Sequence, residues 1–292
     1  GQTFVDDIIV FEPNHIFSLL KKIKQFDLAI DCEPYLNISA IIGSLLAKKQ
    51  IGFEHGSRAR LYHQTIKYND QQHVVKTYCD LATLLDVHAQ PTKLVPLTYS
   101  KTDEENVKNL LATLNIHSDD TIIGICATTA ETSKDRKWPL ENYANVINQL
   151  TQNKIRHVIL VGGRNDFEEL EQLRNSCQNR KNVHNTAGKT TLKQLFALIK
   201  QCSLFISNDT GPMHIAAAQG VRTIGIFGPN LPARFRPFGK DHISLYEKQY
   251  CSPCINVHKG EFPKCFNQIK GKCVKDIQPE QVLEAVTQCM NG

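Results

Sequence analysis

The stretch SNDTGPMHIAAAQGVRTIGIFGP, Ser207–Pro229, predicts the end of a strand, a sharp loop, a helix and a second strand. The run Ser203–Ser207 is short and mostly apolar, as a buried strand is, and Arg222–Phe227 has the same character. Apolar runs joined through a helix are typical of parallel strands covered on both faces. The stretch therefore predicts one strand–helix–strand unit of a parallel sheet.

The loop between these strands, Asn208–Gly211, leads into Pro212, which suits the first position of a helix because it has no N–H to lose. We expect the side-chain oxygen of Asp209 or Thr210 to cap the free N–H groups of the first turn. An open helix N-terminus at the carboxyl edge of a parallel sheet favours anions. The motif therefore predicts a binding site for a phosphate-bearing ligand.

The composition of the 292-residue chain is that of an ordinary globular protein, with 41% hydrophobic and 22% charged residues. The net charge of +5 is mild and scattered. It fits an anionic small ligand or an anionic membrane surface, and it lacks the dense basic stripe of a nucleic-acid binder. Six of the ten cysteines fall in expected strands and helices, as reduced, buried thiols do.

Strands and helices alternate along the chain, which predicts α/β architecture with parallel sheets and helices on both faces. The expected strands are residues 6–11, 27–32, 50–53, 121–127, 156–163, 182–188, 203–207 and 222–227. The expected helices are residues 15–26, 36–49, 73–87, 104–114, 140–150, 167–177 and 191–202. The simplest arrangement is two Rossmann-like domains, residues 1–98 and 99–292, with a cleft between them.

Two further loops of the second half carry candidate ligand contacts. In Ala127–Pro139, Thr128 and Thr129 offer hydroxyl groups to phosphate oxygens, and Arg136 or Lys137 offers a neutralising charge. A solvated loop without a ligand explains any one of these residues equally well.

The glycines of the loop Gly162–Asp166 allow close backbone approach, and Asp166 is placed to accept hydrogen bonds from ribose hydroxyls. The loop Asn185–Leu192 lacks the glycine spacing of a Walker motif. We therefore interpret Thr190 or Thr191 as the cap of the next helix.

Within the opening motif, we expect the backbone amides of Thr210, Gly211 and Met213 to donate hydrogen bonds to an anion. Asp209 would repel a diphosphate, so it should cap the helix or accept hydrogen bonds from sugar hydroxyls. His214, one turn into the helix, is by itself more often a packed histidine than a ligand contact.

The segment CSPCINVHKGEFPKCFNQIKGKC, residues 251–273, holds Cys251, Cys254, Cys265 and Cys273 in a polar, lysine-rich stretch. Four thiols in this pattern suit a structural zinc ion or an iron–sulfur cluster. The alternative is free thiols or one redox-labile disulfide. A metal here would stabilise the segment rather than take part in a reaction.

In order along the chain, these motifs resemble glycosyltransferase family 9, the bacterial heptosyltransferases of the lipopolysaccharide inner core. The matching pieces are FDLAID (26–31), IGF (51–53), HVVKTYCDLATLLDV (73–87), ATT with a basic residue and WP (127–139), VGG (161–163), NDTGPMHIAAAQGVRTIGIFGP (208–229), the cysteine segment and IQPEQVLEAV (277–286). The resemblance covers essentially the whole chain, and residues 209–218 are its most specific part.

The resemblance implies a GT-B fold, with two facing Rossmann-like domains. The nucleotide-sugar donor would bind residues 99–292 and the glycolipid acceptor residues 1–98. The implied reaction is inverting transfer of a heptose or related sugar from an ADP-sugar to a lipopolysaccharide core or lipid A-type acceptor, with no cofactor required. The implied location is the cytoplasm, peripheral to the inner face of the bacterial inner membrane, and no nucleic acid is involved.

Carried over by position, the resemblance places Thr128 and Thr129 at the donor diphosphate and Asp166 near a family glutamate that contacts the donor. Arg136 stands where the family has a lysine before x-W-P, and three extra residues precede it. The remaining implied donor contacts lie on the family signature: Asp209, Thr210, Gly211 and His214.

One family segment is not found in this chain. Family members begin with a strand, an S-x-G-D loop and a helix, and the aspartate of that loop is thought to be the general base. The resemblance therefore places the catalytic base upstream of Gly1. Without that segment the chain would bind donor but transfer poorly, and its first sheet would have an uncovered edge.

Two rival functions fit the same motifs. A sugar-nucleotide epimerase or hydrolase of the same two-domain fold would need no acceptor. A non-catalytic sugar-nucleotide-binding protein would hold the donor without transfer.

Overall fold

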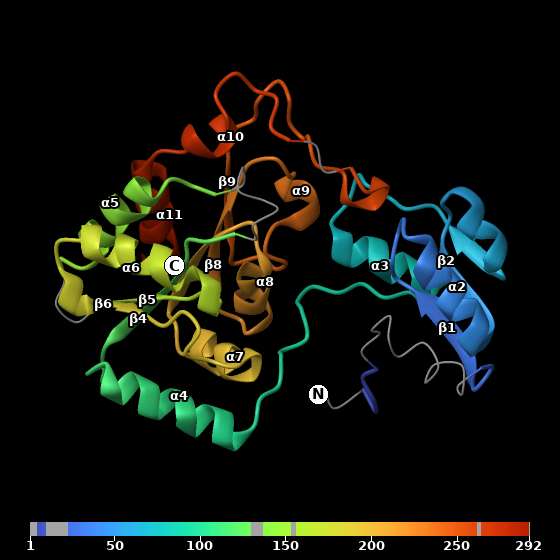
Figure 1. Ribbon diagram of the computed structural model, residues 1–292, viewed down its shortest axis with the longest axis horizontal. Helices are drawn as coiled ribbons and strands as arrows, with labels where there is room; N and C mark the ends of the chain where they lie inside the picture. Colours follow the sequence, from blue (N-terminus) through green and yellow to red (C-terminus); the bar gives the residue numbers. More distant parts are fainter. Residues whose placement is uncertain (1–4, 10–22, 130–136, 153–155, 262–263, 292) are drawn as a thin grey trace. The chain divides into compact units, whose positions relative to one another are not determined.

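The computed structural model describes residues 5–9, 23–129, 137–152, 156–261 and 264–291 (Figure 1). The chain divides into two compact units. The N-terminal unit comprises Val5–Pro91 with Ile255–Pro263, and the C-terminal unit comprises Thr92–Cys254 with Lys264–Gly292. Part of the cysteine-rich segment therefore belongs to the N-terminal unit, although it lies late in the sequence.

The C-terminal unit is built on a six-stranded parallel sheet with the order β6–β5–β4–β7–β8–β9. Its strands are β4 (Thr121–Cys126), β5 (Arg156–Leu160), β6 (Val183–Asn185), β7 (Leu204–Asn208), β8 (Arg222–Phe227) and β9 (Ile243–Tyr246). In chain order this is the 3-2-1-4-5-6 arrangement of dinucleotide-binding sheets, in which the strand order reverses between the first and fourth strands. The predicted parallel α/β architecture is confirmed.

Helices cover both faces of this sheet (Figure 1) because the strands are apolar on both faces. One core, which contains Ile123 and Ile125, lies under α5 (Leu140–Leu150), α6 (Phe167–Ser176) and α11 (Pro279–Asn291). The other, which contains Ile122 and Cys126, lies under α4 (Lys101–Thr113), α7 (Leu192–Lys200) and α8 (Gly211–Ala218). The alternation along β4 therefore holds two helical layers to one sheet.

Several predicted helices form where the sequence placed them. Helix α5 spans the predicted residues, and its apolar stripe buries Tyr143 and Leu150. Helix α7 begins after Thr191, whose hydroxyl accepts a hydrogen bond from Gln194 N at 3.2 Å. The Gln194 side chain accepts from Thr191 N at 3.0 Å in return. This capping box confirms the cap predicted at this loop.

The N-terminal unit holds a three-stranded parallel sheet, β1–β2–β3. Its elements are β1 (Phe26–Asp31), α2 (Asn37–Leu46), β2 (Ala47–Phe53), η2 (Gly56–Leu61), β3 (Gln64–Ile66) and α3 (Val74–Thr83). Arg58 Nη2 donates to Asp31 Oδ2 at 2.7 Å, and the Tyr62 hydroxyl donates to the same oxygen at 2.8 Å. The pKa of Tyr62 is raised far above its ordinary value, mainly because the hydroxyl is buried and secondly because it donates a hydrogen bond to Asp31. This buried network fixes η2 to the carboxyl end of β1.

The start of the chain differs from the prediction. The strand expected over residues 6–11 is not formed in its described part, Asp6–Ile9, and the rest of it lies outside the described residues. Most of the helix expected over residues 15–26 also lies outside them. Strand β2 begins at Ala47, inside the expected helix, because Ala47 pairs with Phe26 in the parallel ladder. Strand pairing overrides the helical pattern there.

The remaining helical segments are short. They are η4 (Arg164–Asp166), η5 (Arg180–Asn182), α9 (Pro232–Phe235), η6 (Val257–Lys259) and α10 (Lys272–Lys275). Among the described residues, no helix has both the length and the apolar character needed to cross a membrane.

Two histidines of the sheet are buried side by side. His157 Nδ1 lies 3.0 Å from His184 Nε2, and His157 Nε2 lies 3.5 Å from Asp120 Oδ2. Burial, followed by the nearby charge of His157, lowers the pKa of His184 to about 4. The folded protein therefore keeps His184 neutral at and below neutral pH.

We predict that the protein loses stability as the pH falls from 6.5 toward about 4. Unfolding restores the ordinary pKa of His184, so the unfolded chain binds an extra proton in this window. The free energy of unfolding then drops by up to about 1.4 kcal/mol per pH unit. Thermal unfolding between pH 4 and 8 should show a flatter profile for His184→Gln than for the wild type. The exposed-site control His88→Gln should keep the wild-type slope, and three equal slopes would contradict the prediction.

Candidate functional site

The candidate site lies where β4 and β7 end side by side. These strands are parallel neighbours, with Cys126 paired to Ser207 at their carboxyl ends. The loop after β7 contacts the end of β4, because Cys126 Sγ lies 3.7 Å from Thr210 Oγ1. At such a reversal of strand order the two loops diverge to opposite faces, and ligands of this sheet type bind there.

Asn208, the last residue of β7, joins the two loops. Its side chain is fully buried, and Oδ1 accepts a hydrogen bond from Trp138 N at 3.0 Å while Nδ2 donates to Thr128 O at 3.5 Å. Trp138 is itself buried, and its indole Nε1 donates to Ile277 O at 2.8 Å. Asn208 therefore holds both ends of the loop after β4. From the sequence, Asn208 was expected only as part of a loop, although an amide side chain at the end of a buried strand is a usable signal for such a role.

The start of α8 is not capped as predicted. Thr210 is the N-cap residue, but no side chain makes a capping hydrogen bond. Its hydroxyl donates to Asn208 O at 3.3 Å and lies 3.2 Å from Ser207 Oγ. The carboxylate of Asp209 instead accepts from Asn230. The predicted capping by Thr210 is wrong, because its hydroxyl bonds to the end of β7 instead.

The backbone N–H groups of α8 that were predicted to donate to an anion are not equally available. Met213 N already donates to Thr210 O at 3.1 Å, and the Met213 side chain is fully buried. Gly211 is different, because among the described residues no atom outside its own helix and chain neighbours lies within 4 Å of the position that a Cβ would take. The backbone at Gly211 therefore borders open space, as close approach of a ligand requires.

Asp209 and His214 form the polar part of the motif. Asp209 is only 6% exposed, and its Oδ2 accepts from Asn230 Nδ2 at 2.5 Å. Its backbone N donates to Ile226 O at 3.1 Å, which fixes the loop to β8. Burial lowers the pKa of His214, although the charge of Asp209 acts in the opposite direction. The site therefore pairs a buried carboxylate with a neutral imidazole.

The other predicted contacts have mixed settings. Thr128 is buried beside Asn208, and Thr129 follows it. Lys137 forms an ion pair with Glu169 of α6. Arg136 lies outside the described residues.

Asp166 folds back on its own loop after β5. Its Oδ2 accepts from Gly163 N at 2.7 Å. The same carboxylate oxygen lies 2.9 Å from where a Cβ on Gly162 would be, so this glycine gives the turn its room. The structure thus shows a local role for Asp166.

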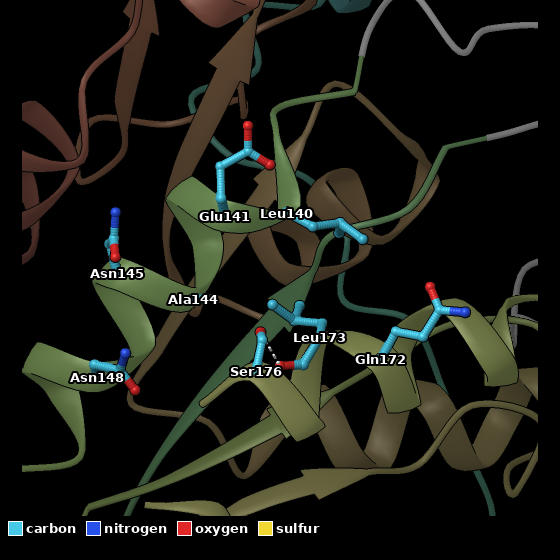
Figure 2. Close-up of a pocket in the computed structure, with 8 residues that line it drawn as sticks. All are labelled: Leu140, Glu141, Ala144, Asn145, Asn148, Gln172, Leu173 and Ser176. Carbon is cyan, nitrogen blue, oxygen red and sulfur yellow. Dashed lines mark hydrogen bonds between the residues drawn. The ribbon is translucent and has the colours of Figure 1, made fainter. Parts of the chain in front are cut away.

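A separate groove of about 370 Å³ lies between α5 and α6 (Figure 2). It is lined by Leu140, Glu141, Ala144, Asn145, Asn148, Gln172, Leu173 and Ser176. Among these eight residues the only charge is the carboxylate of Glu141, which would repel a phosphate. The groove therefore does not suit an anionic donor.

None of the four cysteines of residues 251–273 forms a disulfide among the described residues. Burial, followed by the nearby charge of Cys254, raises the pKa of Cys273 to about 11, and Gly271 N donates to Cys265 Sγ at 3.5 Å. In the parts of the chain that the structure describes, no group of three or more His, Cys, Asp or Glu side chains is arranged to hold a metal ion. The predicted metal site is therefore not formed in this structure.

Comparison with known proteins agrees with the geometry. The model of glycosyltransferase family 9 (heptosyltransferase) matches residues 16–263. The chain belongs to glycosyltransferase family 9. The lipopolysaccharide core heptosyltransferase OpsX of Haemophilus influenzae is 28% identical over 282 residues, covering 92% of this chain and 77% of that protein. The predicted family and the predicted enzyme class, a glycosyltransferase, are confirmed.

Two solved structures share the fold of this family member. A family 9 glycosyltransferase from Veillonella parvula superposes with a TM-score of 0.79 at 19% identity, covering 96% of this chain and 80% of that one. The E. coli ADP-heptose lipopolysaccharide heptosyltransferase II has a TM-score of 0.70 at 23% identity, covering 94% and 78%. These likenesses confirm the predicted GT-B fold.

We predict that Gly211→Ala leaves the fold intact and weakens binding of a nucleoside diphosphate. Alanine fits the open space and favours a helix, so the thermal midpoint should stay equal or rise. Its methyl group would occupy the approach to the backbone amide, and binding of ADP by calorimetry should weaken about tenfold, or about 1.4 kcal/mol.

Gly220 lies just past the other end of α8 and is the matched control. Its φ of +73° is strained for alanine, so Gly220→Ala should lower the midpoint and leave ADP affinity unchanged. Unaltered ADP affinity in Gly211→Ala would contradict the assignment of the phosphate site.

Proposed function

We propose that this protein is an inverting glycosyltransferase that moves a heptose, or a related sugar, from an ADP-sugar to the core or lipid A region of lipopolysaccharide. The observation that supports this most directly is the open backbone at Gly211, beside the buried Asp209, at the carboxyl edge of the sheet. The H. influenzae relative is named a lipopolysaccharide core heptosyltransferase, and the E. coli neighbour is named for ADP-heptose.

In the proposed complex the donor diphosphate lies against the start of α8. The amides of Thr210 and Gly211 donate to it, and the positive end of the helix dipole stabilises its charge. Thr128 and Thr129 approach it from the loop after β4. Lys137 forms an ion pair with Glu169, so it must leave Glu169 to reach the phosphate.

Arg136 and Lys137 are the proposed cations of the site, one or both of which meet the phosphate. A carboxylate beside the diphosphate would oppose binding, so we assign Asp209 to hydroxyl groups of the donor. His214, neutral and one turn further along α8, is assigned to the same part of the donor. Asp166 is assigned to the ribose, through the carboxylate oxygen that does not bind Gly163 N.

The proposed reaction is a displacement at C1 of the heptose. The bond from C1 to the phosphate oxygen breaks, and ADP leaves with the bonding electron pair. The acceptor hydroxyl oxygen bonds to C1 from the opposite face, and its proton passes to a general base. The helix start and the cations of the loop stabilise the charge that develops on the departing ADP. The transfer requires no cofactor.

We further propose that the N-terminal unit binds the glycolipid acceptor, and that the protein works at the cytoplasmic face of the inner membrane without spanning it. A lipopolysaccharide precursor carries acyl chains and phosphates, so it stays in the membrane surface while its sugars are extended. The mild positive charge of the chain suits such an anionic surface.

We predict that the protein, assayed with the family's S-x-G-D segment present, releases ADP from ADP-heptose and adds one heptose mass to one acceptor in a panel of truncated lipopolysaccharides. Asp209→Ala should lower the rate at least about 100-fold, the scale of losing one positioned contact in a transition state. Asp119→Ala, at the exposed amino edge of the sheet, is the matched control and should keep full activity.

Two results would contradict this function. ADP or an epimerised sugar formed from the donor alone, at the same rate with and without acceptor, would favour the hydrolase or epimerase. Tight donor binding with no transfer to any acceptor, in a protein that also carries the family's S-x-G-D segment, would favour a binding protein.

For the cysteine segment we propose a structural zinc ion or an iron–sulfur cluster, held by Cys251, Cys254, Cys265 and Cys273 once their thiols are brought together. Two N–H donors already lie near sulfur atoms, as in sites where they offset thiolate charge. These are Gly271 N to Cys265 Sγ at 3.5 Å and Asn267 Nδ2 to Cys251 Sγ at 3.7 Å.

We predict that elemental analysis of the purified protein finds either about one zinc or about two to four irons per chain. Cys254→Ser should lose that metal and lower the thermal midpoint, because the segment has little apolar core of its own. The control is Cys177→Ser, which changes a buried cysteine at the end of α6 and should leave the metal content unchanged. A metal-free wild type with an unchanged midpoint in chelator would rule the proposal out.

A further inference from the structure

We infer that Asn230 is a further donor-recognition residue, whose buried amide oxygen accepts a hydrogen bond from a hydroxyl group of the sugar nucleotide. This rests on the proposed function of the site. Neither the sequence motifs nor the family resemblance assigned a role to this residue, which follows the strand β8.

The fold places Asn230 directly against the signature loop. Strand β8 is the parallel neighbour of β7, and Ser207 of β7 pairs with Gly225 of β8. Asp209 N then donates to Ile226 O, which continues the contact past the end of the ladder. Asn230 and Asp209 therefore meet at the same carboxyl edge.

The orientation of the Asn230 amide follows from its partner. Its nitrogen donates to Asp209 Oδ2 at 2.5 Å. A carboxylate only accepts hydrogen bonds when ionised, so the amide oxygen cannot take this position without repulsion. The amide oxygen is therefore directed away from that carboxylate oxygen.

That oxygen is buried and has no hydrogen-bond partner among the described residues. Asn230 is only 4% exposed. Buried polar atoms are nearly always hydrogen-bonded in folded proteins, and an exception calls for a physical reason. A ligand that brings its own donor provides one.

Asn185, at the end of β6 on the same sheet edge, shows what the fold does with an asparagine that has a structural role. Its Nδ2 donates to Phe167 O at 3.0 Å and to Glu171 Oε2 at 3.1 Å. Its Oδ1 accepts from Ala187 N at 3.1 Å. Every polar atom of that side chain is satisfied, so the free acceptor of Asn230 is not a general feature of this edge.

The chemistry of the free acceptor selects the ligand group. An amide oxygen needs a donor, and an ionised diphosphate offers only acceptors. Hydroxyl groups do donate, and Asn230 Oδ1 and the Asp209 carboxylate present two acceptors close together. Such a pair suits neighbouring hydroxyls, which the ribose and the transferred sugar both carry.

The test is calorimetric binding to the 292-residue chain, with ADP, 2′-deoxy-ADP, 3′-deoxy-ADP and ADP-heptose as ligands. Asn230→Ala should bind the cognate ligand about tenfold more weakly than the wild type. If the partner is a ribose hydroxyl, the wild type should bind one of the two deoxy-ADP ligands about tenfold more weakly than ADP. Asn230→Ala should then bind that deoxy-ADP and ADP with equal affinity. If it is a sugar hydroxyl, the variant should bind ADP normally and ADP-heptose weakly.

Controls separate this inference from folding and from the proposed function. Asn185→Ala should lower the thermal midpoint without changing any affinity, and Asn230→Ser serves if Asn230→Ala does not fold. An unchanged affinity for every ligand, or losses that simply add between variant and deoxy ligand, would overturn the role of Asn230. If the wild type itself binds neither ADP nor ADP-heptose, the proposed function fails instead.

Discussion

The parallel pairing of β4 with β7 is the contact on which the rest of the site depends. It brings together two loops that are about 80 residues apart in the chain, and Asn208 Nδ2 spans that separation to Thr128 O. The strand order reverses at this pair, so the loops leave toward opposite helical layers. No local preference in either loop would place them side by side.

Burial at this edge of the sheet requires its polar side chains to have hydrogen-bond partners. Asn208 and Asp209 lie almost wholly inside the protein, where an unpaired polar group is costly. Trp138 N and Asn230 Nδ2 supply their partners from other loops. The loops are therefore fixed by a few directed bonds, and open space remains at Gly211, where the backbone can approach a ligand. The fold thus holds rigid polar groups beside the open backbone of Gly211.

Much of the fold was predictable from the sequence because its signals are local. Apolar runs such as Arg222–Phe227 form strands in a sheet buried on both faces, and the spacing of apolar residues in Leu140–Leu150 forms a helix. Pro212 and the small residues after it marked α8 correctly. These features depend on neighbours within a few residues, and no distant contact had to be known.

The sequence by itself determined the alternation of strands and helices in most of the C-terminal unit, the family motifs and the edge of the sheet at which they gather, but not the short strands β3 and β9. Only the tertiary structure decided what each polar group bonds to. Asp209 accepts a hydrogen bond from Asn230, 21 residues further along the chain, and Ala47 joins a strand instead of a helix. The physical reason is that hydrogen bonds are directional, and a donor hydrogen that has bonded to one acceptor is no longer available to another. A partner far along the chain can outcompete a local one, and its position is known only when the sheet has formed.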